Sequence, residues 1–170
     1  MKSVFALILV IVFSQGCQQP KQELPTPIST YYLIRHAEKD RSNPKNHDPY
    51  LTEKGMDRAE LWARIFKKVT FDEIYSTNYK RTLQTITAVG MDNNTEVKIY
   101  HPDSLVTPAF REQTLGKNVL IVGHSNTTPR VVNQLIEDEH YKDMDDSDNG
   151  SLYIVTLAGG GKTVEILDLN

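Results

Sequence analysis

Strand-like and helix-like segments alternate along the chain from residue 31 onward. Short runs rich in β-branched and aromatic residues predict strands at 31–34, 73–75, 97–100 and 119–122. The other segments predict helices at 52–68, 79–89, 108–115 and 129–138, and apolar residues recur at helical spacing within 59–66 and 131–136. This order is typical of an α/β sheet. Two last apolar runs, 152–157 and 164–167, flank a glycine-rich turn and predict a terminal hairpin.

Local signals mark the helix boundaries. Thr107 and Thr128 each precede a proline, which predicts an N-cap followed by proline at the first helical position. Gly90 and Gly116 stand where a helix C-terminus usually takes a glycine. We expect the apolar stripes of 59–66 and 131–136 to pack in the core.

The first 17 residues differ in character from the rest. Lys2 is followed by ten apolar residues, Val4 to Phe13, and then by Ser14, Gln15, Gly16 and Cys17. Ten residues rise about 15 Å as a helix, about half the hydrocarbon thickness of a bilayer, so this run predicts an export signal rather than a permanent span. A small residue directly before a lone cysteine resembles the lipobox of bacterial lipoproteins. The resemblance implies a lipidated Cys17 and an exported protein anchored to a bacterial membrane; the alternative is ordinary signal cleavage that leaves a free thiol.

The domain organisation follows from these segments. Residues 18–30 hold three prolines and few large apolar groups, so they predict a tether between the signal of 1–17 and a single domain of 31–170.

Composition excludes several classes. One cysteine in 170 residues excludes a disulfide framework and a zinc ribbon. The 19 basic residues are dispersed among 22 acidic ones, for a net charge of −3, which argues against nucleic acid as a partner. Any anion site must therefore be local.

Candidate chemistry appears where predicted strands end. Arg35 and His36, Arg81 and His124 all follow strand runs, and ligands of open α/β sheets bind beyond the carboxyl ends of strands. Arginine guanidinium groups match phosphate oxygens bidentately, and Ser125 leads into a helix whose N-terminal amides favour anions. Together these residues predict an oxyanion pocket.

Three segments carry a family resemblance. Residues 33–38 (Leu-Ile-Arg-His-Ala-Glu), 76–85 and 122–126 resemble, in order and spacing, the histidine phosphatase superfamily, also called the phosphoglycerate mutase-like family. The resemblance implies a three-layer α/β/α sandwich with a mostly parallel sheet. It implies no metal and no other cofactor. The segment from Asp145 to Gly150 begins like a calcium loop, but Thr156 stands at the last ligand position, so we expect an acidic surface loop.

The resemblance also implies roles for the candidate residues. His36 would attack phosphorus and become a phosphohistidine that water hydrolyses, while Arg35, Arg81, His124 and Ser125 would bind the phosphoryl group. The residues themselves agree, because neighbouring arginines disfavour protonation of His36 and keep its imidazole nucleophilic.

The acid that protonates the leaving group departs from the family pattern. Better-known members place a Glu after the third strand, and none follows Tyr100 here. Asp103 is the nearest carboxylate and Asp48 is the rival.

Three functional classes stay open. The first is a hydrolase of a small phosphate ester or a phosphoprotein. The second is a binding module that keeps the anion pocket without turnover. The third is a cofactor-independent phosphomutase, which the short chain disfavours because it leaves little room for insertions that enclose the substrate.

Overall fold

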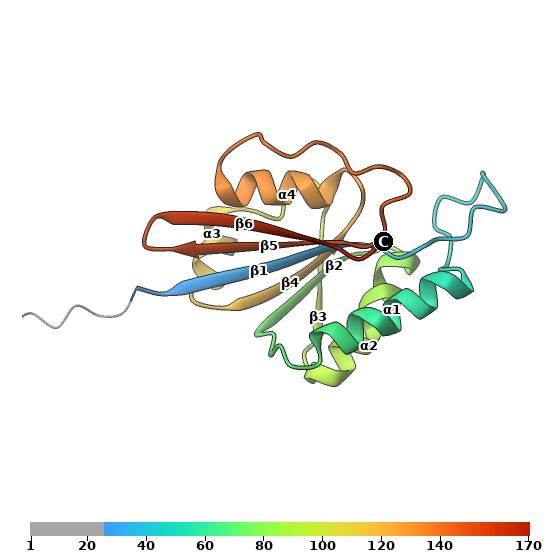
Figure 1. Ribbon diagram of the computed structural model, residues 1–170, viewed down its shortest axis with the longest axis horizontal. Coiled ribbons are helices and arrows are strands. Elements are labelled where there is room, and N and C mark those ends of the chain that lie inside the picture. Colours follow the sequence, from blue (N-terminus) through green and yellow to red (C-terminus); the bar gives the residue numbers. More distant parts are fainter. Residues whose placement is uncertain (1–25) are drawn as a thin grey trace, which may run out of the picture.

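The structure is a computed structural model, and it describes residues 26–170 (Figure 1). Its six strands form one sheet in the order β3-β2-β4-β1-β5-β6. The strands are β1 (Ile28–Arg35), β2 (Glu73–Thr77), β3 (Val97–Tyr100), β4 (Asn118–Gly123), β5 (Ser151–Ala158) and β6 (Gly161–Asp168). The first four are parallel to one another, and the β5–β6 hairpin adds two antiparallel strands. The mostly parallel sheet and the terminal hairpin are thus confirmed.

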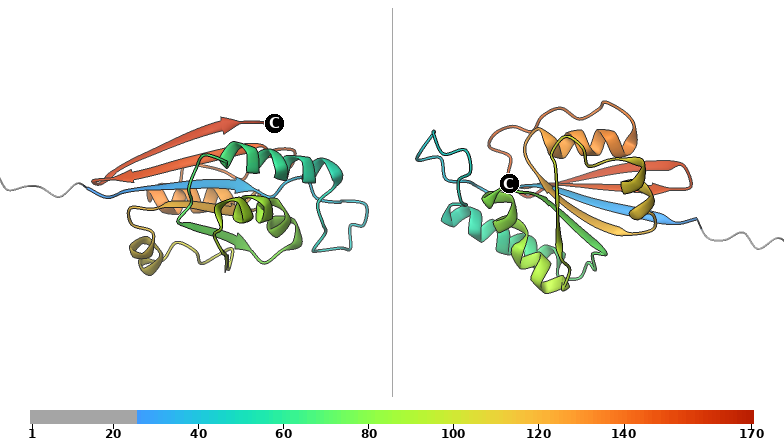
Figure 2. Two further views of the ribbon diagram at one scale, coloured as in Figure 1. Left: turned by 90° about the horizontal axis from the view of Figure 1, so that it is seen from below. Right: turned by 180° about the vertical axis from the view of Figure 1, so that it is seen from behind.

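Helices cover both faces of the sheet. The helices α1 (Glu53–Phe66) and α2 (Lys80–Asn93) lie on one face, and α3 (Pro108–Gln113) and α4 (Thr127–Ile136) lie on the other (Figures 1 and 2). Successive residues of β4 alternate between the two layers. Val119 and Ile121 belong to the apolar cluster with α3 and α4, while Leu120 and Val122 belong to the cluster with α1 and α2. The predicted three-layer α/β/α sandwich is confirmed, and it buries a strand on both faces.

The two apolar stripes lie in these layers, as expected. Trp62 and Phe66 of α1 are 0% and 1% exposed, and Val132 and Leu135 of α4 are both 0% exposed. Each stripe therefore fixes which side of its helix faces the sheet.

Two helix-boundary predictions are wrong. Gly90 lies inside α2, which ends instead at Asn94 with a left-handed φ of 51°. Asparagine tolerates this conformation, and Gly90 is needed for close packing, since a Cβ there would stand 3.3 Å from the Val97 side chain. Helix α4 begins at Thr127 with Asn126 as its N-cap, because the Thr128 hydroxyl donates to the Ile34 carbonyl at 3.3 Å instead of capping the helix.

Two other boundary predictions are confirmed. The Thr107 hydroxyl accepts from the Phe110 amide at the start of α3, and Gly116 has a φ of +75° just after that helix.

The strand β1 starts at Ile28, three residues before its predicted start. Ser29 and Thr30 pair with Leu157 and Thr156 of β5, and the Ser29 hydroxyl accepts from the Gly116 amide at 2.8 Å. The last three residues of the predicted tether are therefore part of the sheet. The predicted signal, the lipidation site Cys17 and the first part of the tether lie outside the described residues. Within residues 26–170, the structure contains no helix that is long and apolar enough to span a bilayer.

Candidate active site

The predicted pocket forms where β1 and β4 end and α2 and α4 begin. His36 directly follows β1 and His124 directly follows β4, and their ring centroids lie 5.4 Å apart. Arg81 lies in the first turn of α2. His36, His124 and Arg81 line a cavity of about 390 Å³. Its full lining is Arg35, His36, Lys39, Tyr79, Arg81, Pro102, Asp103, His124, Ser125, Asn126, Thr127 and Asp146.

A glycine lets the chain turn sharply into this pocket. A Cβ on Gly123 would lie 2.8 Å from the Thr127 hydroxyl and 3.0 Å from the Tyr100 hydroxyl. With that space open, the His124 amide donates to the Thr127 hydroxyl at 2.8 Å. The absence of a side chain at Gly123 therefore allows His124 to follow directly after β4, at the edge of the sheet.

His36 is a buried, neutral imidazole. Its side chain is 2% exposed, and Nδ1 lies 2.8 Å from the Ala37 carbonyl, which can only accept a hydrogen bond. Nδ1 therefore carries the proton and Nε2 carries the lone pair. Burial, followed by the charges of Arg35, His124 and Arg81, lowers the pKa of His36 to about 3. The ring is thus poised as a nucleophile through Nε2 at neutral pH.

His124 and Arg81 contact each other in the pocket. Arg81 Nη2 lies 3.5 Å from Nδ1 of His124, and Nε2 of His124 lies 2.9 Å from the Thr77 hydroxyl. Burial and the charges of Arg81, Lys39 and Arg35 lower the pKa of His124 to about 4. The Arg81 guanidinium lies over the Tyr79 ring at 4.4 Å. The buried Nε atoms of Arg81 and of Arg35 both have no hydrogen-bond partner among the described residues. Such a donor suits an anionic ligand.

The acidic loop predicted at the surface surrounds Arg35 instead. Nη1 of Arg35 donates to the backbone carbonyls of Asp145, Asp146 and Asp148 at 2.8, 3.2 and 2.9 Å. Nη2 donates to the Asp146 carboxylate at 2.9 Å. The carboxylates of Asp145 and Asp146 are exposed, as expected, but the loop backbone holds a guanidinium that is 2% exposed. The loop thus fixes the position of Arg35.

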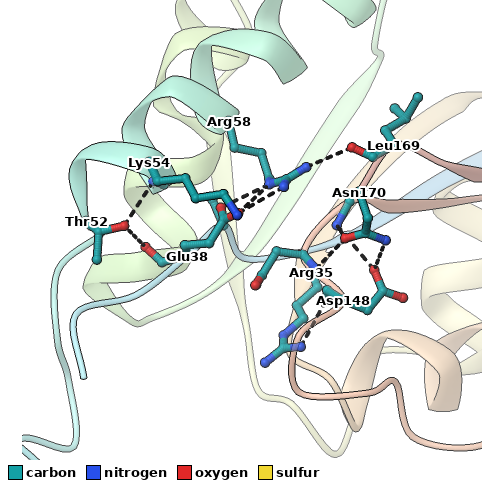
Figure 3. A network of polar contacts seen from close by, with 12 residues as sticks. Arg35, Glu38, Thr52, Lys54, Arg58, Asp148, Leu169 and Asn170 are labelled. Carbon is teal, nitrogen blue, oxygen red and sulfur yellow. Dashed lines mark hydrogen bonds and ion pairs between the residues drawn. The ribbon is translucent and has the colours of Figure 1, made fainter.

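A polar network supports this loop from behind (Figure 3). The Asn170 side chain accepts from the amides of Asn149 and Gly150 at 3.1 and 2.9 Å and donates to the Asp148 carboxylate at 3.0 Å. Asn149 in turn donates to the His36 carbonyl at 2.9 Å. The loop therefore braces both Arg35 and His36.

Glu38 extends the network toward α1. Its carboxylate accepts from Arg58 at 2.9 to 3.0 Å, and Arg58 also donates to the Leu169 carbonyl at 3.1 Å (Figure 3). Hydrogen bonds from Arg58 outweigh the effect of burial and lower the pKa of Glu38. Glu38 thus anchors the segment after His36 instead of lining the cavity.

Comparison with known proteins shows a likeness to one family over part of the chain. The model of the histidine phosphatase superfamily (branch 1) matches residues 31–103, which include Arg35, His36 and Arg81. Over this segment the chain is similar to the histidine phosphatase superfamily. No curated protein sequence matches it.

Solved structures share the histidine phosphatase fold at low identity. Phosphoglycerate mutase from Bacillus anthracis is 16% identical with a TM-score of 0.64, over 84% of this chain and 94% of that chain. The α-ribazole phosphatase from Shigella flexneri is 17% identical with a TM-score of 0.63, over 82% and 96%. The protein histidine phosphatase SixA, solved with tungstate, is 19% identical with a TM-score of 0.62, over 82% and 96%. These likenesses establish the fold.

The two candidate acids lie in different settings. Asp103 lines the cavity rim, is 65% exposed, and pairs with Arg130 at 2.5 Å and with His101 at 3.9 Å. Asp48 does not line the cavity. Its carboxylate accepts from the Lys80 amide at 2.8 Å and lies 3.8 Å from Arg81, so it caps the start of α2.

Sequence reasoning missed several residues of the cavity. Lys39, three residues after His36, contributes a cation, and burial lowers its pKa. Tyr79 packs its ring edge-on against His124 at 5.1 Å. Tyr79 lies inside the motif of residues 76–85 and Lys39 directly follows the motif of residues 33–38, so their spacing from Arg81 and His36 could have signalled them; Asp146 had no such signal.

Proposed function

We propose that the protein is a phosphohydrolase that works through a phosphohistidine on His36. In the first step, Nε2 of His36 forms a bond to phosphorus as the bond from phosphorus to the leaving group breaks. In the second step, a water oxygen attacks phosphorus, the bond between Nε2 and phosphorus breaks, and inorganic phosphate leaves. The observation that carries the proposal is the hydrogen bond from His36 Nδ1 to the Ala37 carbonyl, which leaves Nε2 unprotonated in a cationic cavity.

Three side chains around His36 would stabilise the charge of the phosphoryl group. Arg35, Arg81 and His124 would take the role that Mg²⁺ has in many phosphoryl-transfer enzymes. Preorganised donors of this kind are worth roughly 2.7 to 4 kcal/mol each in the transition state. The helix α4 begins beside the cavity, with Thr127 in its lining, and its first amides add to the positive potential.

The substrate is a phosphate ester or a phosphoprotein, and the pairing of Asp103 favours weakly basic leaving groups. The Asp103 carboxylate is already occupied by its contact with Arg130, so it is poorly placed to act as the general acid. A phosphoramidate such as phosphohistidine needs less help, because its imidazole can take a proton from water. The likeness to a structure named protein histidine phosphatase supports this choice.

An anchored, exported location is part of the proposal. A lipid on Cys17 would hold the domain near the membrane through the segment that follows it, and would favour substrates at that surface.

The decisive experiment is a turnover and labelling assay on the full chain. The substrates are p-nitrophenyl phosphate, an alkyl phosphate and a phosphohistidine peptide. We expect release of inorganic phosphate and an acid-labile phosphoryl label that His36→Ala abolishes and the exposed-site control His140→Ala retains. Labelling of His36→Ala contradicts the mechanism. Anion binding without turnover on any substrate favours the binding module, and an isomerised product without phosphate release favours a mutase.

A further inference from the structure

A chain of buried hydroxyl groups ends at the ring of His124. The single proton of the Thr82 hydroxyl is taken up by the carbonyls of Thr77 and Tyr79, which lie 2.8 and 2.9 Å from Oγ1. The Thr77 hydroxyl donates to Thr82 Oγ1 at 3.1 Å. Both threonines are 0% exposed, so no water competes for these bonds. A hydroxyl has one proton to donate. Once that proton points to Thr82, the Thr77 oxygen can only accept from His124.

The contacts of both ring nitrogens of His124 agree on which one carries the proton. His124 Nε2 lies 2.9 Å from the Thr77 oxygen and must therefore be the protonated nitrogen. His124 Nδ1 lies 3.5 Å from Arg81 Nη2, and arginine is a donor that has no acceptor function. Nδ1 therefore carries the lone pair. Two contacts on opposite sides of the ring select one neutral tautomer.

We propose that Thr77 is a positioning residue that fixes His124 as the Nε2–H tautomer, with the lone pair on Nδ1. When a tetrahedral oxyanion binds in the pocket, Nδ1 then takes up a proton from solvent. The proposal rests on the proposed function for its catalytic meaning, but not for anion binding. A neutral Nδ1 presents a lone pair, which repels a phosphoryl oxygen. A protonated Nδ1 donates to that oxygen, which is the contact that transition-state stabilisation requires.

The charges that face His124 explain why the proton arrives only with the anion. Arg81 and Tyr79 face it from the start of α2, Arg35, His36 and Lys39 from β1 and the segment after it, and Asp103 and Asp146 from the rim. With the pocket empty, burial and the cations keep the ring neutral. A bound dianion offsets the cations and favours the charged ring.

The ring tautomer can be observed directly by ¹⁵N NMR of histidine-labelled full chain at neutral pH, with His124 assigned by its loss in His124→Ala. We expect the Nε2–H tautomer in the wild type and in Thr77→Ser, which keeps the hydroxyl, and a mixture of tautomers in Thr77→Val. Thr114→Val is the matched control, since Thr114 is also 0% exposed but bonds Tyr31 and does not line the cavity. A wild-type Nδ1–H tautomer, or an unchanged ring in Thr77→Val, overturns the proposal.

A tungstate titration tests whether anion binding protonates Nδ1 of His124. At about pH 5.5, the free ring is neutral and tungstate should protonate Nδ1 of His124 in the wild type. Tungstate binding with no protonation of His124 overturns this part. In turnover, Thr77→Val should lower kcat roughly 10- to 100-fold, with a smaller change in KM, and Thr77→Ser should restore it. If the tautomer and the proton behave as expected but no substrate turns over, the proposed function fails and the positioning of His124 stands.

Discussion

Glu73→Gln should cost about 3 kcal/mol of stability at neutral pH. Glu73 begins β2, at the edge of the sheet opposite the pocket, and is 4% exposed. Its carboxylate accepts from Lys117 at 2.6 Å, Lys98 at 2.9 Å and Gln113 at 3.0 Å, and from the Tyr75 hydroxyl. Burial raises the pKa of this carboxyl, but these bonds outweigh it and hold the pKa at about 2 instead of 4.5. At about 1.4 kcal/mol per pKa unit, that difference gives the quoted cost.

The sign of the pH dependence follows from the lowered pKa. The stabilisation by Glu73 is fully present above the unfolded-state pKa of 4.5 and is lost as the pH falls toward about 2. Between pH 7 and pH 3, it should decline by about 2 kcal/mol.

Chemical denaturation at these two pH values tests the reasoning. The variants are Glu73→Gln and the surface control Glu60→Gln, whose side chain is 70% exposed. We expect the wild type and the control to lose stability together on acidification, and Glu73→Gln to lose about 2 kcal/mol less. Equal losses in all three proteins would refute the assigned role of Glu73.

Three further predictions concern the site and the N-terminus. Arg81→Ala should raise the inhibition constant of vanadate and lower kcat together, because a charge-assisted contact serves both ground and transition states; unchanged inhibition would place Arg81 outside the anion contacts. Asp103→Asn should slow alkyl phosphates and p-nitrophenyl phosphate by less than the roughly 10²- to 10⁴-fold that general acid catalysis contributes. A loss of that size on the alkyl ester alone would make Asp103 the acid, and the same pattern in Asp48→Asn would move the role there. Full-length chain expressed in bacteria should partition with membranes, and Cys17→Ser should not; mass spectrometry showing an unmodified N-terminus would replace anchoring with secretion.

The layers of the fold could be predicted because the burial of a strand or helix is reflected in the pattern of apolar residues in its sequence. The continuous apolar run of β4 and the one-sided stripe of α4 reflect where each element lies. Helix ends were harder to predict where a tertiary contact overrides the local signal. Gly90 packs against Val97 and Thr128 bonds the Ile34 carbonyl, and neither partner is apparent from the residues beside the helix end.

The site shows the same division. His36 and His124 could be placed from sequence, because each directly follows a strand and parallel strands end at one edge. The neutral state of His36 could also be predicted, from the neighbouring arginines. The tautomer of His124 could not, since the contact that we propose to fix it comes from Thr77, 47 positions earlier. The partners of Arg35 lie more than 100 positions away, and apart from the Asp146 carboxylate they are backbone carbonyls, which leave no trace in residue type.

The two arginines, which look equivalent in sequence, are prepared for different tasks. Three backbone carbonyls and the Asp146 carboxylate occupy the terminal nitrogens of Arg35, so its charge is fixed beside His36 before any ligand arrives. Arg81 has weaker partners, the His47 carbonyl at 3.3 Å and the Asp48 carboxylate at 3.8 Å. A guanidinium whose partners are long can turn its donors to an incoming anion at little cost. We therefore expect Arg35 to act mainly by keeping His36 neutral, and Arg81 to carry most of the contact with the phosphoryl oxygens.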